Sequence, residues 1–325
     1  MDRLLHIHAL FRKIPFLLSC VVAAACGGRK PASPAAPVSR EFPLIEVPSL
    51  YTETEERVGY AVAHFWDRFL DTSRVYTCDS VLVNGVTADA LEEQFGTFVS
   101  LAEMVPLKDG KAAVEQMFNR AEAFGRKEPA VFKSLSDLVR KYLYDPNSPV
   151  RSEDLYQPWV RRLSASPLVD SLLYLGYAWE AKMCALNGIG TKATDFSFTD
   201  TRGRRRTLYG IQADHLLLIF GNPDCKACRE LTEEMGAEPS VSALIKSGSL
   251  KVVDVYIDRE INEWKAHMAE YPADWINGYD HSFSIRSDLL YNIRGIPSIY
   301  LLDASKTVLL KDAPTDKVLE ALAAL

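Results

Sequence analysis

The strongest constraint on this chain is an apolar run that leads straight into a Cys-x-x-Cys motif. Residues 216–219 (LLLI) have the continuous apolar pattern of a buried strand, and a helix is expected from Cys225 to about residue 235. The cysteines at 225 and 228 therefore lie between the exit of a strand and the start of a helix. The free N–H groups and positive dipole end of a helix start favour a thiolate over the free thiol, whose ordinary pKa is about 8.5. Since a thiolate attacks disulfides, the motif predicts thiol-disulfide exchange.

Two other interpretations of the motif stay open. Zinc sites use the same spacing but normally need four ligands. The chain has no second Cys-x-x-Cys, and outside the leader it has only the histidines His64, His215, His267 and His281. An inert structural disulfide is the other alternative, although so short a loop gives little chain-entropy stabilisation. We therefore expect neither a metal nor a cofactor.

A second motif follows at residues 294–303 (RGIPSIYLLD), where a proline stands at the mouth of an apolar strand. Pro297 has no N–H to donate to a sheet, so it is awkward as a central strand residue. It fits if the bond between Ile296 and Pro297 is cis and lies in a tight turn. An ordinary turn proline is the alternative.

Together the two motifs resemble the thioredoxin fold, in its TlpA/ResA-like branch of membrane-tethered thiol-disulfide oxidoreductases. The resemblance implies that Cys225 attacks a substrate disulfide and that Cys228 resolves the mixed disulfide. It also implies that Pro297 packs beside the two sulfurs and that the backbone of Ile296 hydrogen-bonds an extended substrate segment.

The proton acceptor is where the chain departs from this family. Many thioredoxins carry a buried aspartate six residues before the first cysteine, but here that residue is Ile219. Glu230 is the nearest carboxylate in sequence and is a candidate general base, with a solvated side chain as the alternative. Lys226, between the cysteines, is a candidate for stabilising the thiolate.

The N-terminus predicts a bacterial lipoprotein. Residues 1–25 run from a basic segment through an apolar stretch to small residues, and Cys26 follows directly. Cleavage before Cys20 is the alternative, but it leaves an apolar core of only six residues. The apolar run 14–25 is too short for a bilayer, which needs roughly 20 residues. We expect a lipid anchor at Cys26 in the cell envelope, facing the periplasm.

The rest of the chain divides into a tether and two domains. Residues 26–49 are rich in Pro, Ala and Ser and read as a tether. A helical domain is expected over 50–188 and a thioredoxin-like domain over 189–325. Without residues 1–25 the chain has 34 basic and 42 acidic residues, a net charge of −8, which argues against nucleic acid as a partner.

The expected fold is all-α followed by a central mixed sheet flanked by helices. Thr52 and Glu55 suggest a capping box at the first helix. Further helices are expected at 87–105, 111–124, 129–144, 152–163 and 167–186, with their aromatic and methionine positions in the core. In the second domain we expect strands at 195–200, 207–209, 215–220, 252–257, 298–302 and 307–310, and helices at 225–235, 261–270 and 315–325. The segments 142–149, 165–170 and 186–193 resemble a helical domain of unknown function that precedes thioredoxin-like domains in Bacteroidales lipoproteins.

The leading hypothesis is a membrane-anchored thiol-disulfide oxidoreductase that reduces envelope proteins. Its partners are disulfide-containing envelope proteins, an unidentified thiol-disulfide electron donor and, through the lipid anchor, the membrane. A binding or scaffold lipoprotein without turnover is the first alternative, and a chaperone for soft metal ions is the second. Cys78 and Cys184 could pair in an oxidising compartment, but Cys184 lies on an apolar helix face and reads as a buried free thiol.

Overall fold

The computed structural model describes residues 39–325, which form one structural unit. The predicted signal sequence and both candidate lipidation cysteines lie outside these residues. The predicted tether (26–49) is described only from residue 39, and from there to residue 49 it contains neither helix nor strand. Within residues 39–325, no helix combines the length and the apolar character that crossing a membrane requires.

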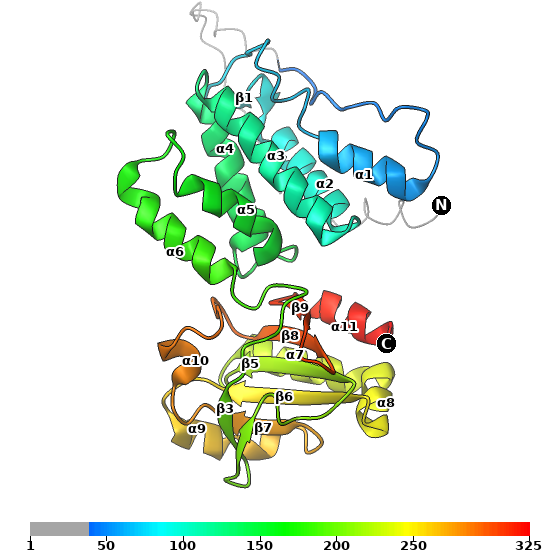
Figure 1. Cartoon of the computed structure of the whole chain (residues 1–325), viewed down its shortest axis with the longest axis vertical. Coiled ribbons are helices and arrows are strands. Elements are labelled where there is room, and N and C mark those ends of the chain that lie inside the picture. The colour runs from blue at the N-terminus through cyan, green and yellow to red at the C-terminus, as the bar shows by residue number, and fades with distance from the viewer. Residues whose placement is uncertain (1–38) are drawn as a thin grey trace, which may run out of the picture. The chain divides into compact units, whose positions relative to one another are not determined.

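The first part of the described chain is helical, as the sequence predicts. Its helices are α1 (Thr54–His64), α2 (Ala88–Glu103), α3 (Leu107–Gly125), α4 (Pro129–Val139), α5 (Glu153–Leu163) and α6 (Tyr174–Cys184) (Figure 1). A π-helix, η2 (Arg140–Tyr144), extends α4, and a 3-10 turn, η3 (Ser171–Leu173), precedes α6. The strands β1 (Leu82–Val83) and β2 (Val86–Thr87) form a short antiparallel hairpin that the sequence patterns do not reveal.

The starts of α2 and α1 differ in whether a side chain caps the helix. The Thr87 side chain accepts a hydrogen bond from the Ala90 N–H, which satisfies a free donor at the start of α2. The capping box expected at Thr52 is wrong, because α1 begins at Thr54 with Glu53 at its N-cap and no side-chain cap bond.

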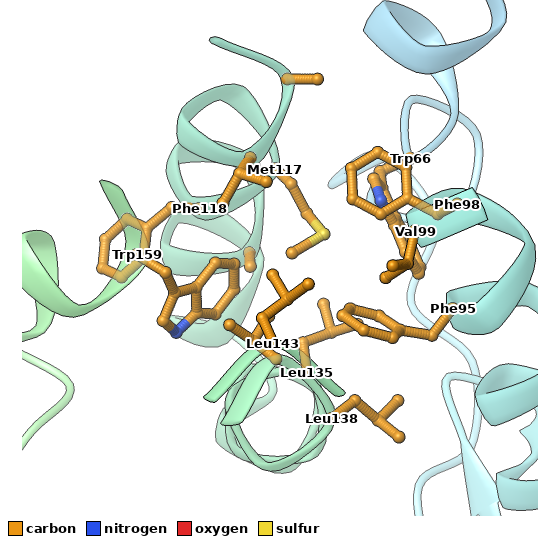
Figure 2. Close-up of a cluster of buried hydrophobic side chains, with 14 of the residues drawn as sticks. Trp66, Phe95, Phe98, Val99, Met117, Phe118, Leu135, Leu138, Leu143 and Trp159 are labelled. Atoms are coloured by element: carbon orange, nitrogen blue, oxygen red, sulfur yellow. The ribbon is translucent and has the colours of Figure 1, made fainter. Parts of the chain in front are cut away.

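The helical part has an aromatic-rich core. Figure 2 shows the labelled side chains of this cluster turned toward one another from several helices. Trp66, Phe95, Met117 and Trp159 are all buried, which confirms the prediction that such positions are core. Trp179 on α6 is an exception, since 49% of its surface is exposed.

The second part of the chain is a mixed sheet, as the sequence predicts. Its strands are β3 (Ser197–Asp200), β4 (Arg205–Thr207), β5 (His215–Gly221), β6 (Leu250–Tyr256), β7 (Ile276–Tyr279), β8 (Ser298–Asp303) and β9 (Val308–Lys311) (Figure 1). They lie in the order β4-β3-β7-β6-β5-β8-β9. The pairs β5–β6 and β6–β7 are parallel, and the others are antiparallel.

Apolar side chains on both faces of the sheet bury its central strands. On one face, Ile219 of β5 belongs to a cluster with residues of α7 (Lys226–Ala237), α8 (Pro239–Ser247) and α11 (Thr315–Ala323). On the other face, Phe220 of β5 belongs to a cluster that includes Ile285 of α10 (Ser284–Ser287). The short elements α9 (Ile261–Ala266) and η4 (Met268–Glu270) connect β6 to β7. Burial on both sides explains why β5 reads as an uninterrupted apolar run.

Candidate redox site

The turn from β5 to α7 positions the two cysteines. Cys225 is the N-cap of α7, and its sulfur accepts a hydrogen bond from the Cys228 N–H at 3.2 Å. The Cys225 N–H donates to the Asn222 carbonyl at 3.1 Å, which closes the turn before the helix. A backbone N–H aimed at the sulfur and the positive end of α7 both stabilise a thiolate once the pair is reduced.

Cys225 and Cys228 are joined by a disulfide, with their Cα atoms 5.2 Å apart. Their environments differ. Cys225 is partly exposed, whereas Cys228 is only 8% exposed. A bulky disulfide can therefore reach Cys225, while Cys228 is placed to attack Cys225 from within the protein.

The predicted proline loop lies beside this disulfide. The Ile296–Pro297 bond is cis, as the sequence predicts, and the Ile296 carbonyl oxygen lies 3.5 Å from the Cys225 sulfur. Ile296 and Pro297 also border a cavity of about 400 Å³, which Glu230 of α7 borders as well. The structure thus brings together the cysteines and the loop that two distant motifs supply.

Lys226 and Glu230 occupy the outer side of α7. Their side chains form an exposed ion pair at 3.1 Å. Such a pair contributes under about 1 kcal/mol to stability because solvent screens it. Glu230 borders the cavity at Pro297, whereas Cys228 borders a different one. The proposed roles of both residues stay predictions.

A carboxyl that the sequence reading missed lies on the inner side of the pair. Asp254 is 6% exposed in the middle of β6, where it is the parallel-strand partner of Ile219 on β5. Burial raises its pKa from the usual range to about 7. Asp254 and Cys228 border one cavity of about 280 Å³. The available signal was an aspartate inside the otherwise apolar segment 252–257 (VVDVYI), a position that solvent does not explain.

The segment before Pro297 is anchored by a buried ionic cluster. The Arg294 guanidinium donates to Glu153 of α5 at 2.6 Å and to Asp312 at 2.8 Å, and the Lys311 ammonium lies 2.8 Å from Glu153. Burial raises the pKa of Glu153, while the cations of Lys311 and Arg294 oppose that rise. The cluster therefore ties the proline loop to the helical part of the chain.

The other two described cysteines are free. Cys184 is buried, which confirms the sequence prediction, and burial raises the pKa of its thiol. Cys78 is partly buried, and its sulfur accepts a hydrogen bond from the Asn84 N–H at 3.1 Å. Burial raises the pKa of Cys78 as well. Burial therefore disfavours the thiolate form of both free cysteines.

Comparisons with known proteins show which family the chain belongs to. A protein-family model described as a domain of unknown function (DUF5106) matches residues 19–175. A solved thioredoxin-like protein from Bacteroides caccae is 35% identical, with a TM-score of 0.76 over 88% of this chain and 99% of that one. The C-terminal domain of an uncharacterized protein from Bacteroides fragilis is 44% identical over 42% of this chain and 98% of that one, with a TM-score of 0.41. A domain of a possible thiol-disulfide isomerase from Cytophaga hutchinsonii is 26% identical over 43% and 94% of the two chains, with a TM-score of 0.37. No curated protein matches.

Proposed function

The chain belongs to the thioredoxin-like family, and on that premise we propose that it is a membrane-anchored thiol-disulfide oxidoreductase that reduces disulfides of envelope proteins. One observation carries the proposal. Cys225 is partly exposed at the start of α7, and its disulfide partner Cys228 is sheltered beneath it. This asymmetry suits a pair in which one sulfur meets the substrate and the other completes the exchange.

The reaction has two steps. In the reduced protein, the Cys225 thiolate attacks one sulfur of a substrate disulfide, which forms a mixed disulfide and releases the other substrate sulfur as a thiolate. Cys228 then attacks the Cys225 sulfur, releases the second substrate thiolate and forms the Cys225–Cys228 bond. The substrate is reduced by two electrons and the protein pair is oxidised by two. An unidentified thiol donor returns the pair to the dithiol.

The loop at Pro297 is proposed to orient the substrate. The Ile296 carbonyl oxygen lies next to the Cys225 sulfur, where it can accept a hydrogen bond from the backbone of an extended polypeptide. The adjacent cavity of about 400 Å³ has room for a side chain flanking the substrate cysteine. Extended segments of envelope proteins are therefore the proposed substrate class.

The anchor is proposed on the N-terminal sequence. Cys26 follows a basic and apolar leader, and lipidation there would hold the protein at the membrane on the periplasmic side. In a bacterial host that carries out lipidation, Cys26→Ser should move the protein from the membrane fraction to the soluble fraction. Cys20→Ser is the matched control and should leave it bound. The reverse result would assign the anchor to Cys20.

Trapping tests the catalytic proposal. Cys228→Ala should accumulate a mixed disulfide with insulin on non-reducing electrophoresis, because Cys225 attacks and nothing resolves the product. Cys225→Ala should trap nothing, and Cys184→Ala is a matched control that should turn over insulin like the wild type. No adduct with Cys228→Ala, together with no insulin reduction by the wild type, would overturn the proposal and leave a binding or scaffold role and a soft-metal chaperone as the two remaining interpretations.

A further inference from the structure

The buried position of Asp254 costs the folded protein free energy whenever its carboxyl is ionised. Asp254 lies in the middle of β6 between two sheet neighbours, only 6% exposed, and its strand is otherwise apolar except for Lys251 near its start. A buried carboxylate costs free energy unless it is paired or hydrogen-bonded, and such groups concentrate at functional sites. Packing alone gives no reason for this aspartate.

The structure aims this carboxyl at the gap beside the resolving cysteine. A β-carbon placed on Gly221, the last residue of β5, would lie 3.6 Å from the Cys228 sulfur and 3.7 Å from the nearer Asp254 oxygen. The sulfur and the carboxyl therefore flank the same small space, which the missing side chain of Gly221 leaves open. Both residues also border the cavity of about 280 Å³. A water occupies about 30 Å³ in the liquid, so the cavity has room for water between them.

We propose that Asp254 accepts the proton of Cys228 during resolution of the mixed disulfide, through water in this cavity. The proposal rests on the proposed thiol-disulfide exchange. The proposed acceptor lies on β6. The position on β5 where many thioredoxins carry a buried aspartate is Ile219 in this chain, which cannot accept a proton.

In the mixed disulfide, the Cys228 S–H bond breaks and its proton passes through water to the Asp254 carboxylate, which becomes a carboxylic acid. The Cys228 thiolate attacks the Cys225 sulfur, the new S–S bond forms and the bond to the substrate sulfur breaks. The substrate leaves as a thiolate and takes a proton from water. When a donor thiol later reduces the pair, the Asp254 acid returns its proton to the departing Cys228 sulfur.

The groups around Asp254 suit this role. The titratable and charged residues around it are Cys228, Arg229 and Glu233 of α7, Glu270 and Tyr271 at the end of η4, and Tyr256 of β6. Burial raises the pKa of Tyr271, so that residue stays protonated and does not compete for the proton. The Arg229 guanidinium donates to the Pro223 carbonyl at 2.7 Å. Because burial brings the pKa of Asp254 to about 7, the carboxyl can both take and return a proton near neutral pH.

The test separates the two sulfur steps. The full chain carries Cys20→Ser, Cys26→Ser and Cys78→Ser, so that the reactive pair and the buried Cys184 remain. The reduced protein is mixed with one equivalent of dithiobis-nitrobenzoate in a stopped-flow instrument. The first release of thionitrobenzoate reports attack by Cys225, and the second reports resolution by Cys228.

Asp254→Asn should slow the second release on the order of 100-fold at pH 7, the usual size of a general-base contribution. It should also move the inflection of that step from near pH 7 to above pH 8, where an unassisted thiol of pKa about 8.5 begins to ionise. The first release should be unchanged. Gly221→Ala keeps the carboxyl but fills the gap at ordinary contact distances, and it should slow the second release in the same direction. The matched control is Glu233→Gln, which removes an exposed carboxyl bordering the same cavity and should change neither step.

Three outcomes would overturn the inference. A normal first release with a second release unaffected by Asp254→Asn would overturn this inference alone. A shifted pH profile in Glu230→Gln but not in Asp254→Asn would assign the proton to Glu230. A chain with no first release would overturn the proposed function and this inference with it.

Discussion

The buried carboxyl of Asp254 should lower the free energy of unfolding of the wild type as the pH rises. Replacing Asp254 by asparagine should stabilise the oxidised protein, and the gain should grow as the pH rises. Burial raises the folded-state pKa to about 7 from an ordinary value of 3.8, so the folded protein binds this proton more tightly than the unfolded chain. Stability from this group is therefore fully present below about pH 4 and is lost as the pH rises through 7. A salt-bridged aspartate would show the opposite slope.

The magnitude follows from the two pKa values. Each unit of difference corresponds to about 1.36 kcal/mol, so a rise of about 3 units costs the wild type about 4 kcal/mol once the carboxyl is ionised. The cost is under about 1 kcal/mol at pH 4, about 2 kcal/mol at pH 5 and about 4 kcal/mol at pH 8. Asparagine has nearly the same shape and no charge, so Asp254→Asn escapes this term.

Urea unfolding of the oxidised protein, followed by circular dichroism between pH 4 and pH 8, measures the effect. The Cys225–Cys228 disulfide stays closed throughout, so those thiols add no titration of their own. The free energy of unfolding of Asp254→Asn minus that of the wild type should rise by about 3–4 kcal/mol across this range. Glu233→Gln, which removes an exposed carboxyl, should show no such rise. A difference independent of pH, or one that falls, would mean that the folded protein stabilises the Asp254 carboxylate, and would refute the reasoning.

Three further predictions concern burial elsewhere. Glu153→Gln leaves Lys311 buried without its anion and should cost about 3–5 kcal/mol in urea unfolding; a cost under about 1 kcal/mol would contradict a buried pair. Gly278→Ala places a β-carbon within 2.6 Å of a ring and a backbone oxygen of β3 and should cost roughly 1–3 kcal/mol, whereas Gly176→Ala in α6 meets nothing within 4 Å and should gain about 1 kcal/mol; equal effects would contradict the packing. Cys184 should resist iodoacetamide until the protein unfolds, as mass spectrometry can show, and native labelling would contradict its burial.

Elements with a strong local signal were predictable from the sequence. The strand at 215–220 became β5, which extends one residue further to Gly221, because its apolar run is covered on both faces. The helix expected at 152–163 became α5, which begins at Glu153 after Ser152 accepts a hydrogen bond from the Leu155 N–H. In both segments, local chemistry and tertiary packing favour the same structure.

Elements fixed by distant partners were not predictable in the same way. β7 is a four-residue strand that pairs with β6 and with the more distant β3, and its residues show no clear alternation. The strand expected at 207–209 is β4, which lies at 205–207 because its antiparallel register with residues 197–199 of β3 sets its position. The helix expected at 167–186 is shortened to α6, since residues 165–170 form turns before it. Strand pairing and turn geometry set the bounds of these elements, and both depend on residues outside the segment itself.

The residues of the candidate site also fall into those that a local motif predicts and one that only distant strand pairing brings to the site. Cys225, Cys228 and Pro297 were found because each belongs to a contiguous motif whose spacing has a chemical meaning. Asp254 belongs to no motif, and it reaches the site only because β6 pairs in parallel with β5 and sets it directly beside Ile219. Adjacent strands present paired residues on the same face, so a carboxyl at either position faces α7 and the sulfur that it carries. The family motif places the acid at one position, six residues before the first cysteine. The proton transfer requires only that an acid lie within reach of Cys228, whichever strand carries it. On the present proposal, the proton acceptor of Cys228 is therefore Asp254 on β6, and the paired position on β5 is occupied by Ile219.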